Sequence, residues 1–164
     1  MDKTTSPASK AIFNRVNWLA ALRAYIVTIS VGNLVWEGAQ LPLYTIWETG
    51  TLGEKAFAVI HCTGGDLLIA LSALVVALVC VGDSDWPHRR FVHVIAATIV
   101  IGVGYTMLSE WLNIVLRKSW AYSALMPVLK VFGFDLGVSP LLQWIAVPLI
   151  AFWFARRGRP MVDS

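Results

Sequence analysis

Charged residues are scarce in this chain of 164 residues, at 14% of the sequence against about a quarter in soluble domains. Hydrophobic residues make up 57%, and the mean hydropathy is +0.67. This shortage of charge excludes an ordinary soluble domain, and the net charge of +3 forms no basic patch for nucleic acid. We therefore predict one all-α domain whose solvent is the lipid bilayer, with no nucleic acid as a partner.

Cysteine is also rare, and its two copies, Cys62 and Cys80, fall in the same predicted helix. A helix rises about 1.5 Å per residue, so roughly 27 Å separates them and no disulfide joins them within the chain. The sequence has no Cys-x-x-Cys, His-x-x-x-His or His-Glu-x-x-His spacing. These absences leave the sequence without a redox motif or a recognised metal motif.

Four apolar segments reach the length of about 20 residues that a membrane-spanning helix needs. They are residues 16–37, 56–81, 92–116 and 139–155. Ser139 followed by Pro140 is typical of a helix start. We predict an integral membrane four-helix bundle in residues 16–157, with a flexible cytoplasmic tail at 1–15 and a second cytoplasmic tail at 158–164.

The basic residues are distributed unevenly between the two sides of these spans. On the side of both termini and the second connection lie Lys3, Lys10, Arg15, Arg23, Arg89, Arg90, Arg156, Arg157 and Arg159. On the other side lie Lys55, Arg117, Lys118 and Lys130. The positive-inside rule then predicts that both termini are cytoplasmic. We expect a multi-pass protein of the cell (inner) membrane whose first span is a retained signal anchor.

The outer connection between the third and fourth spans is too apolar for a solvated loop. It contains Trp120 and Tyr122 among aliphatic residues. An amphipathic helix can lie at the headgroup level, whereas irregular backbone is not tolerated against lipid. We predict an interfacial or re-entrant helix here, and the alternative is an ordinary aromatic belt.

Two of the predicted helices carry a polar face. In the first, Arg23, Ser30 and Glu37 are spaced by seven residues, and Asn33 lies between the last two. In the third, the polar face consists of Thr98, Gly102, Thr106, Glu110 and Asn113. Small and hydroxyl residues in a membrane typically mark helix contacts. We expect both faces to pack against other helices.

Asp66 and Glu110 lie inside the predicted spans, where a charged side chain costs at least a few kcal/mol. Such residues usually face a bundle interior or a water-filled cavity. Glu37 and His61 fall in the same outer half of the bundle, so the pattern predicts a polar pocket that opens outward. The further candidates for its lining are Asn113, Gln143 and Trp120.

Several functions fit such a pocket. Imidazole and carboxylate bind divalent transition metals, so Glu37, His61, Asp66 and Glu110 are candidate metal ligands. The leading hypothesis is a site for a metal ion or small ligand. The alternatives are a proton-coupled carrier, or an enzyme in which Asp66 or Glu110 is a general acid or base on a lipid or isoprenoid substrate. The last is a non-catalytic subunit or scaffold, in a membrane complex or a homo-oligomer.

Overall fold

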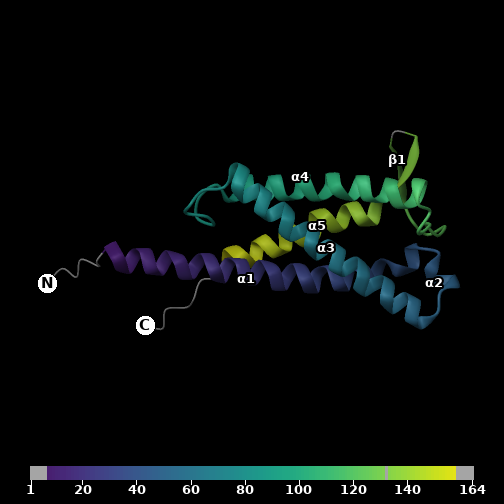
Figure 1. The fold of residues 1–164 in the computed structure, drawn as a ribbon, viewed down its shortest axis with the longest axis horizontal. Coiled ribbons are helices and arrows are strands. Elements are labelled where there is room, and N and C mark those ends of the chain that lie inside the picture. The colour runs from purple at the N-terminus through teal and green to yellow at the C-terminus, as the bar shows by residue number, and fades with distance from the viewer. Residues whose placement is uncertain (1–6, 132, 158–164) are drawn as a thin grey trace.

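The computed structural model describes residues 7–131 and 133–157, with side chains from Trp18 onward. It is mostly helical, and its four long helices are shown in Figure 1. They are α1 (Pro7–Gln40), α3 (Leu52–Val81), α4 (Phe91–Glu110) and α5 (Val138–Arg157). Each contributes a segment long and apolar enough to cross a membrane. By the length and composition of its helices, the chain is a multi-pass membrane protein.

Helix α1 is longer than the sequence predicts. It begins at Pro7, inside the segment 1–15 that the sequence assigns to a flexible tail, so residues 7–15 are helical. Residues 1–6 and the whole predicted tail at 158–164 lie outside the described residues.

Helix α3 also begins earlier than predicted, at Leu52 rather than at residue 56. The reason is a capping box. The Thr51 hydroxyl accepts a hydrogen bond from the Glu54 amide, and the Glu54 carboxylate accepts one from the Thr51 amide. These two bonds satisfy amides that would otherwise have no partner at the start of the helix.

Each of the four long helices packs against two of the others, so that their contacts form a ring. Helix α1 lies against α5 and α3, and α4 lies against α3 and α5. In Figure 1, α1 and α4 run along the long axis while α3 crosses them obliquely. The N-terminal end of α1 and the C-terminal end of α5 lie at one end of the molecule, and α2 (Ile46–Thr49) lies at the other.

The polar face predicted for the third span does pack inward. In α4 the buried positions are Val94, Thr98, Gly102, Thr106 and Glu110. A Cβ on Gly102 would overlap the Trp144 ring of α5, so glycine is what lets the two helices approach this closely.

The end of the molecule where α5 ends has an apolar core. Tyr25 and Ile29 from α1, Leu74 from α3 and Phe152 from α5 are fully buried there. The rings of Tyr25 and Phe152 lie 4.8 Å apart between centroids. Trp86, in the loop between α3 and α4, is 2% exposed and closes this end.

In the connection between α4 and α5, the described residues form one helical segment at its start and then a β-hairpin. After a π-helical turn at Trp111–Leu116, strand β1 (Val128–Val131) pairs antiparallel with β2 (Phe134–Gly137). Tyr122 adds a single β-bridge to Tyr44. The prediction of an interfacial or re-entrant helix is therefore wrong for the described residues of this connection.

The hairpin has local causes in the sequence. Pro127 precedes β1 and cannot continue a helical hydrogen-bond ladder. Val128 and Val131 are β-branched and favour extended backbone. Gly133 lies in the turn with φ at 86°, a conformation that suits glycine. These features outweigh the aromatic and apolar pattern from which a helix was predicted.

Candidate functional site

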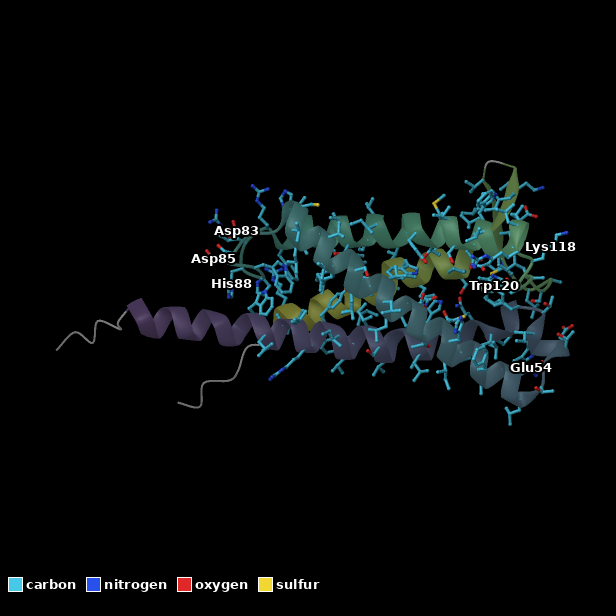
Figure 2. All side chains as sticks on the ribbon, in the orientation of Figure 1. Glu54, Asp83, Asp85, His88, Lys118 and Trp120 are labelled. Atoms are coloured by element: carbon cyan, nitrogen blue, oxygen red, sulfur yellow. The ribbon has the colours of Figure 1, made fainter. Side chains whose placement is uncertain are left out.

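Buried polar side chains gather toward the end of the molecule marked in Figure 2 by Glu54, Lys118 and Trp120. Helices α1 and α4 end there and α3 and α5 begin there, so polar residues near those helix ends meet. We name as the polar cluster the buried and half-buried residues Asn33, Glu37, Gln40, Asp66, Glu110, Ser139 and Gln143.

Gln143 of α5 lies at the centre of the cluster. Its Nε2 is 3.1 Å from Asn33 Oδ1, 3.0 Å from Glu37 Oε1 and 2.8 Å from Asp66 Oδ2. A carboxamide nitrogen carries only two hydrogens, so three acceptors share two donors. One side chain thereby joins α5 to both α1 and α3.

Gln40 extends this network toward the start of α5. Its Nε2 donates to Glu37 Oε1 over 2.7 Å and approaches Gln143 Oε1 at 3.3 Å. The Ser139 hydroxyl donates to Gln40 Oε1 over 2.8 Å and accepts from Trp36 Nε1 at 3.2 Å. The Gln40 and Gln143 amides each have their oxygen and nitrogen placed by specific partners, which holds these two side chains in one arrangement.

The two carboxyl groups bound to Gln143 are neighbours without a basic partner. Glu37 and Asp66 both lie within hydrogen-bonding distance of one nitrogen. Among the described side chains, ion pairs occur only in the loop after α3 and in the hairpin, and neither pair includes a residue of the cluster. The described cluster is thus rich in acceptors and contains no cationic side chain.

Glu110, the last residue of α4, has a different set of partners. The Tyr122 hydroxyl donates to Glu110 Oε2 and accepts from the Gly137 amide over 2.8 Å. A Cβ on Gly137 would lie 2.9 Å from the Tyr122 hydroxyl, so a larger residue would displace it. The π-helical turn begins directly after Glu110, and such turns are frequent at functional sites. Glu110 therefore ties the outer connection to the helices.

Two aromatic side chains that carry hydrogen-bond donors, Tyr44 and Trp120, lie beside these acids. The side chain of Tyr44 is half-buried, and its ring centroid is 5.7 Å from that of Tyr122. Burial above all, followed by the negative charge of Glu110, raises the pKa of the Tyr44 hydroxyl, so it stays a donor. Trp120 Nε1 is buried, and the Glu110 carboxylate is the acceptor that it approaches.

Comparison with known proteins gives no further guide to this geometry. No protein-family model, curated protein or solved structure matches the chain. The chemistry of the site is therefore argued from its own side chains.

The structure brings together some of the predicted site residues. Glu37, Asp66 and Gln143 meet directly, and Glu110 and Trp120 lie in the adjoining part of the cluster. The charges of Glu37 and Glu110 both act on Asp66, so the three carboxyl groups share one electrostatic environment.

Two predicted site residues lie apart from the cluster. His61 is exposed, and its ring stacks on Phe57 at 5.3 Å between centroids. Asn113 Nδ2 donates to the Ser109 carbonyl over 2.9 Å, so its side chain bonds to the backbone one turn earlier and not to the cluster. Among the described residues, no group of three or more His, Cys, Asp and Glu side chains is arranged to hold a metal ion.

Several residues of the site were not singled out from the sequence. Gln40 continues the face of Asn33 and Glu37 at helical spacing, so a longer reading of that face would have found it. Tyr44 and Tyr122 carry no such signal. They reach Glu110 through connections between helices, which no helical period describes.

Proposed function

We propose that the polar cluster binds a small ligand at a site within the membrane-spanning part of the protein. The observation that supports it most is the pair Glu37 and Asp66, which share the Gln143 amide without a basic partner among the described residues. Acids that only hold helices together are expected to be paired with a cation, because desolvated charge is costly. An unpaired set of this kind is best explained by a ligand that supplies the missing donors or charge.

We infer that this site faces the outside of the cell (inner) membrane. The cluster lies at the end of the helices opposite the loop that holds Arg89 and Arg90, and opposite Arg156 and Arg157. Basic residues favour the cytoplasmic side. The ligand then arrives from the outer side, past the hairpin or between the helices.

A small organic ligand fits the cluster better than a divalent transition metal does. A metal site needs several ligands at short and equal distances, and His61 is exposed rather than directed to the acids. Trp120 directs its N–H toward Glu110, and an N–H group cannot donate electrons to a metal.

An acid–base enzyme acting on a lipid or isoprenoid is the second candidate. The observation in its favour is that the acids have unlike environments: Glu110 accepts from the Tyr122 hydroxyl, whereas Asp66 accepts from the Gln143 amide. Acids held in unlike environments can take unlike protonation states, as a general acid and a general base must. A scaffold subunit or homo-oligomer would use the same hydrogen bonds only to hold helices.

Cys62 provides a natural reporter of the site. It lies on α3 one turn before Asp66, is partly buried, and experiences the charges of Glu37, Asp66 and Glu110. We would replace the exposed Cys80 by alanine and treat the full-length protein, folded in mild detergent, with a methanethiosulfonate that bears a trimethylammonium group. The expected result is complete modification of Cys62 in the folded state.

The matched control is Val75→Cys in a chain with both native cysteines replaced by alanine. Val75 is 59% exposed on the apolar surface of α3, so lipid or detergent covers it and the charged reagent should not reach it. A Cys62 thiol that reacts only after unfolding would show a sealed cluster and would favour the scaffold role. Elemental analysis of the untagged protein and of Glu110→Gln tests the alternative that the cluster binds a metal ion. Stoichiometric metal in the unchanged protein that is lost in the variant would favour the metal site over the organic ligand.

A further inference from the structure

Basic side chains gather at the end of the molecule opposite the polar cluster. Figure 2 marks this end by Asp83 and His88, in the loop between α3 and α4. Arg90 is the last residue of that loop, and Arg156 and Arg157 are the last two residues of α5. All three arginines are exposed, and we name them the arginine surface.

The structure brings these arginines together from two helices that are far apart in the chain. The Arg156 guanidinium lies over the Phe91 ring, 5.7 Å from its centroid, and Phe91 directly follows Arg90. The Arg157 guanidinium lies over the Trp153 ring at 3.7 Å. Cation–π contacts of this kind hold a guanidinium group in place without neutralising it. The start of α4 and the end of α5 therefore present positive charge side by side.

No acidic side chain among the described residues neutralises this surface. The neighbouring Arg89 pairs with Asp83 at 3.7 Å, whereas the three arginines of the surface form no ion pair within the described part of the chain. The first turn of α4 contains no acidic residue, and its N-cap, Arg90, forms no side-chain cap. The positive end of the α4 dipole then adds to the charge of the arginines. The arginine surface therefore favours an anionic partner.

The position of the arginine surface indicates the class of that partner. Arg90 and Arg156 lie at the ends of segments long and apolar enough to cross a membrane, where basic side chains meet lipid headgroups. On the same helices, Val92 is 70% exposed, and Trp153 and Phe154 are exposed as well. A phospholipid whose acyl chains cover these apolar side chains brings its phosphate to the guanidinium groups. A soluble polyanion would meet the charge and leave the apolar side chains uncovered.

We propose that the arginine surface binds an anionic phospholipid of the surrounding membrane, with the phosphate between the start of α4 and the end of α5. Guanidinium groups bind phosphate through paired N–H donors. Basic pockets between spanning helices are typical sites for anionic headgroups. Binding changes no covalent bond and takes place at the end opposite the polar cluster, so it is independent of the ligand proposed there.

Native mass spectrometry of the full-length protein, delipidated in mild detergent, counts the lipids bound to it. The probes are phosphatidylglycerol, which is anionic, and phosphatidylcholine, which is zwitterionic, with identical acyl chains. The first phosphatidylglycerol should bind at least about fivefold more tightly, because each basic residue near an anionic headgroup contributes about this factor. Since the attraction is electrostatic, raising ammonium acetate from about 0.05 M to about 0.5 M should reduce the preference.

Matched pairs of substitutions locate the bound lipid. Arg90→Gln combined with Arg156→Gln should weaken the binding of phosphatidylglycerol about fivefold or more and leave that of phosphatidylcholine unchanged. Arg117→Gln combined with Lys118→Gln removes the same charge at the opposite end and should change neither. If the first pair fails to fold, as thermal unfolding would show, Arg157→Gln and the salt dependence of the unchanged protein decide the question.

Three results would overturn the proposal. The first is equal binding of the two lipids. The second is an equal loss in both pairs of variants, which would mean that only the net charge of the protein matters. The third is displacement of phosphatidylglycerol by inorganic phosphate, which would assign the surface to a free anion. Binding that persists in excess phosphate and is lost only when Arg90 and Arg156 are replaced would support the lipid site.

Discussion

The two ends of the helical domain are built from the same four helices and are held together differently. At the end where α5 finishes, the side chains of Tyr25, Ile29, Leu74 and Phe152 pack as an apolar core. At the other end, α1, α3 and α5 meet through hydrogen bonds centred on Gln143. Packing of apolar side chains thus joins these helices at the first of the two ends.

This difference makes the polar end the part that needs an explanation beyond folding. Contacts between helices in lipid come from close packing and from polar groups that satisfy each other. The polar end leaves its carboxyl groups without a cationic partner among the described residues, although Glu37 accepts from both Gln40 and Gln143. Stability by itself would be better served by a paired or apolar interface.

The largest loss in the free energy of unfolding is expected from a substitution in the apolar core. Leu74→Ala removes a side chain that is 1% exposed and should lower the free energy of unfolding by about 2–5 kcal/mol. Thermal unfolding followed by tryptophan fluorescence measures this. Val75→Ala, on the exposed side of the same helix, should change it by less than about 0.5 kcal/mol. Equal effects of the two would show that the apolar end is not a packed core.

The next largest loss of stability is expected at the contact between α4 and α5, which lies between the two ends. Gly102→Ala forces a methyl group onto the Trp144 ring and should cost about 1–3 kcal/mol through overpacking. Gly104→Ala meets no atom within 4 Å and should be neutral or stabilising, because alanine favours helix over glycine. Unfolding in detergent would show the contrast, and an equal loss in both variants would argue against this close approach.

The link between Glu110 and the hairpin should have a moderate effect. Tyr122→Phe removes one donor to Glu110 and one acceptor from the Gly137 amide, which we expect to cost about 1–3 kcal/mol. The same unfolding assay near pH 7 measures it. Tyr105→Phe, on the exposed side of α4, is the matched control and should change little.

Tyr122 should also make the stability of the protein depend on alkaline pH, and this effect is smaller than that of Tyr122→Phe near pH 7. Burial, followed by the charge of Glu110, raises the pKa of Tyr122 above its ordinary value of about 10. The unfolded chain then loses this proton first, so the contribution to stability is complete below about pH 10 and declines as the pH rises further. The midpoint of unfolding between pH 9 and 11 should fall less steeply in Tyr122→Phe than in the unchanged protein.

The smallest effect is expected at His61, although the sequence placed it in the site. Its side chain is exposed and stacks on Phe57. His61→Ala should change stability by less than about 0.5 kcal/mol and should leave the Cys62 reaction unaltered. A large change in the rate at which the reagent modifies Cys62 in this variant would mean that the imidazole belongs to the binding site after all.

Sequence patterns predicted the helices well and the connections poorly. The inward face of α4, from Thr98 to Glu110, was correct because a helical period places residues on one side whatever the partner is. The hairpin was missed because its strands are stabilised by each other, through pairing of residues such as Val128 with Gly137. The apolar, aromatic composition of this segment is compatible with a helix, and only local features such as Pro127 and Gly133 indicate a break and a turn.

By itself, the sequence determined that the chain has four apolar helices and that acids lie within them, because length and composition decide how a segment partitions into lipid. Only the tertiary structure decided which polar groups meet. Gln143 joins Glu37 and Asp66, residues 106 and 77 positions away along the chain, while His61, five positions before Asp66, points elsewhere. The reason is that hydrogen bonds act over about 3 Å, and the distance between atoms depends on how helices pack and not on their spacing in the chain.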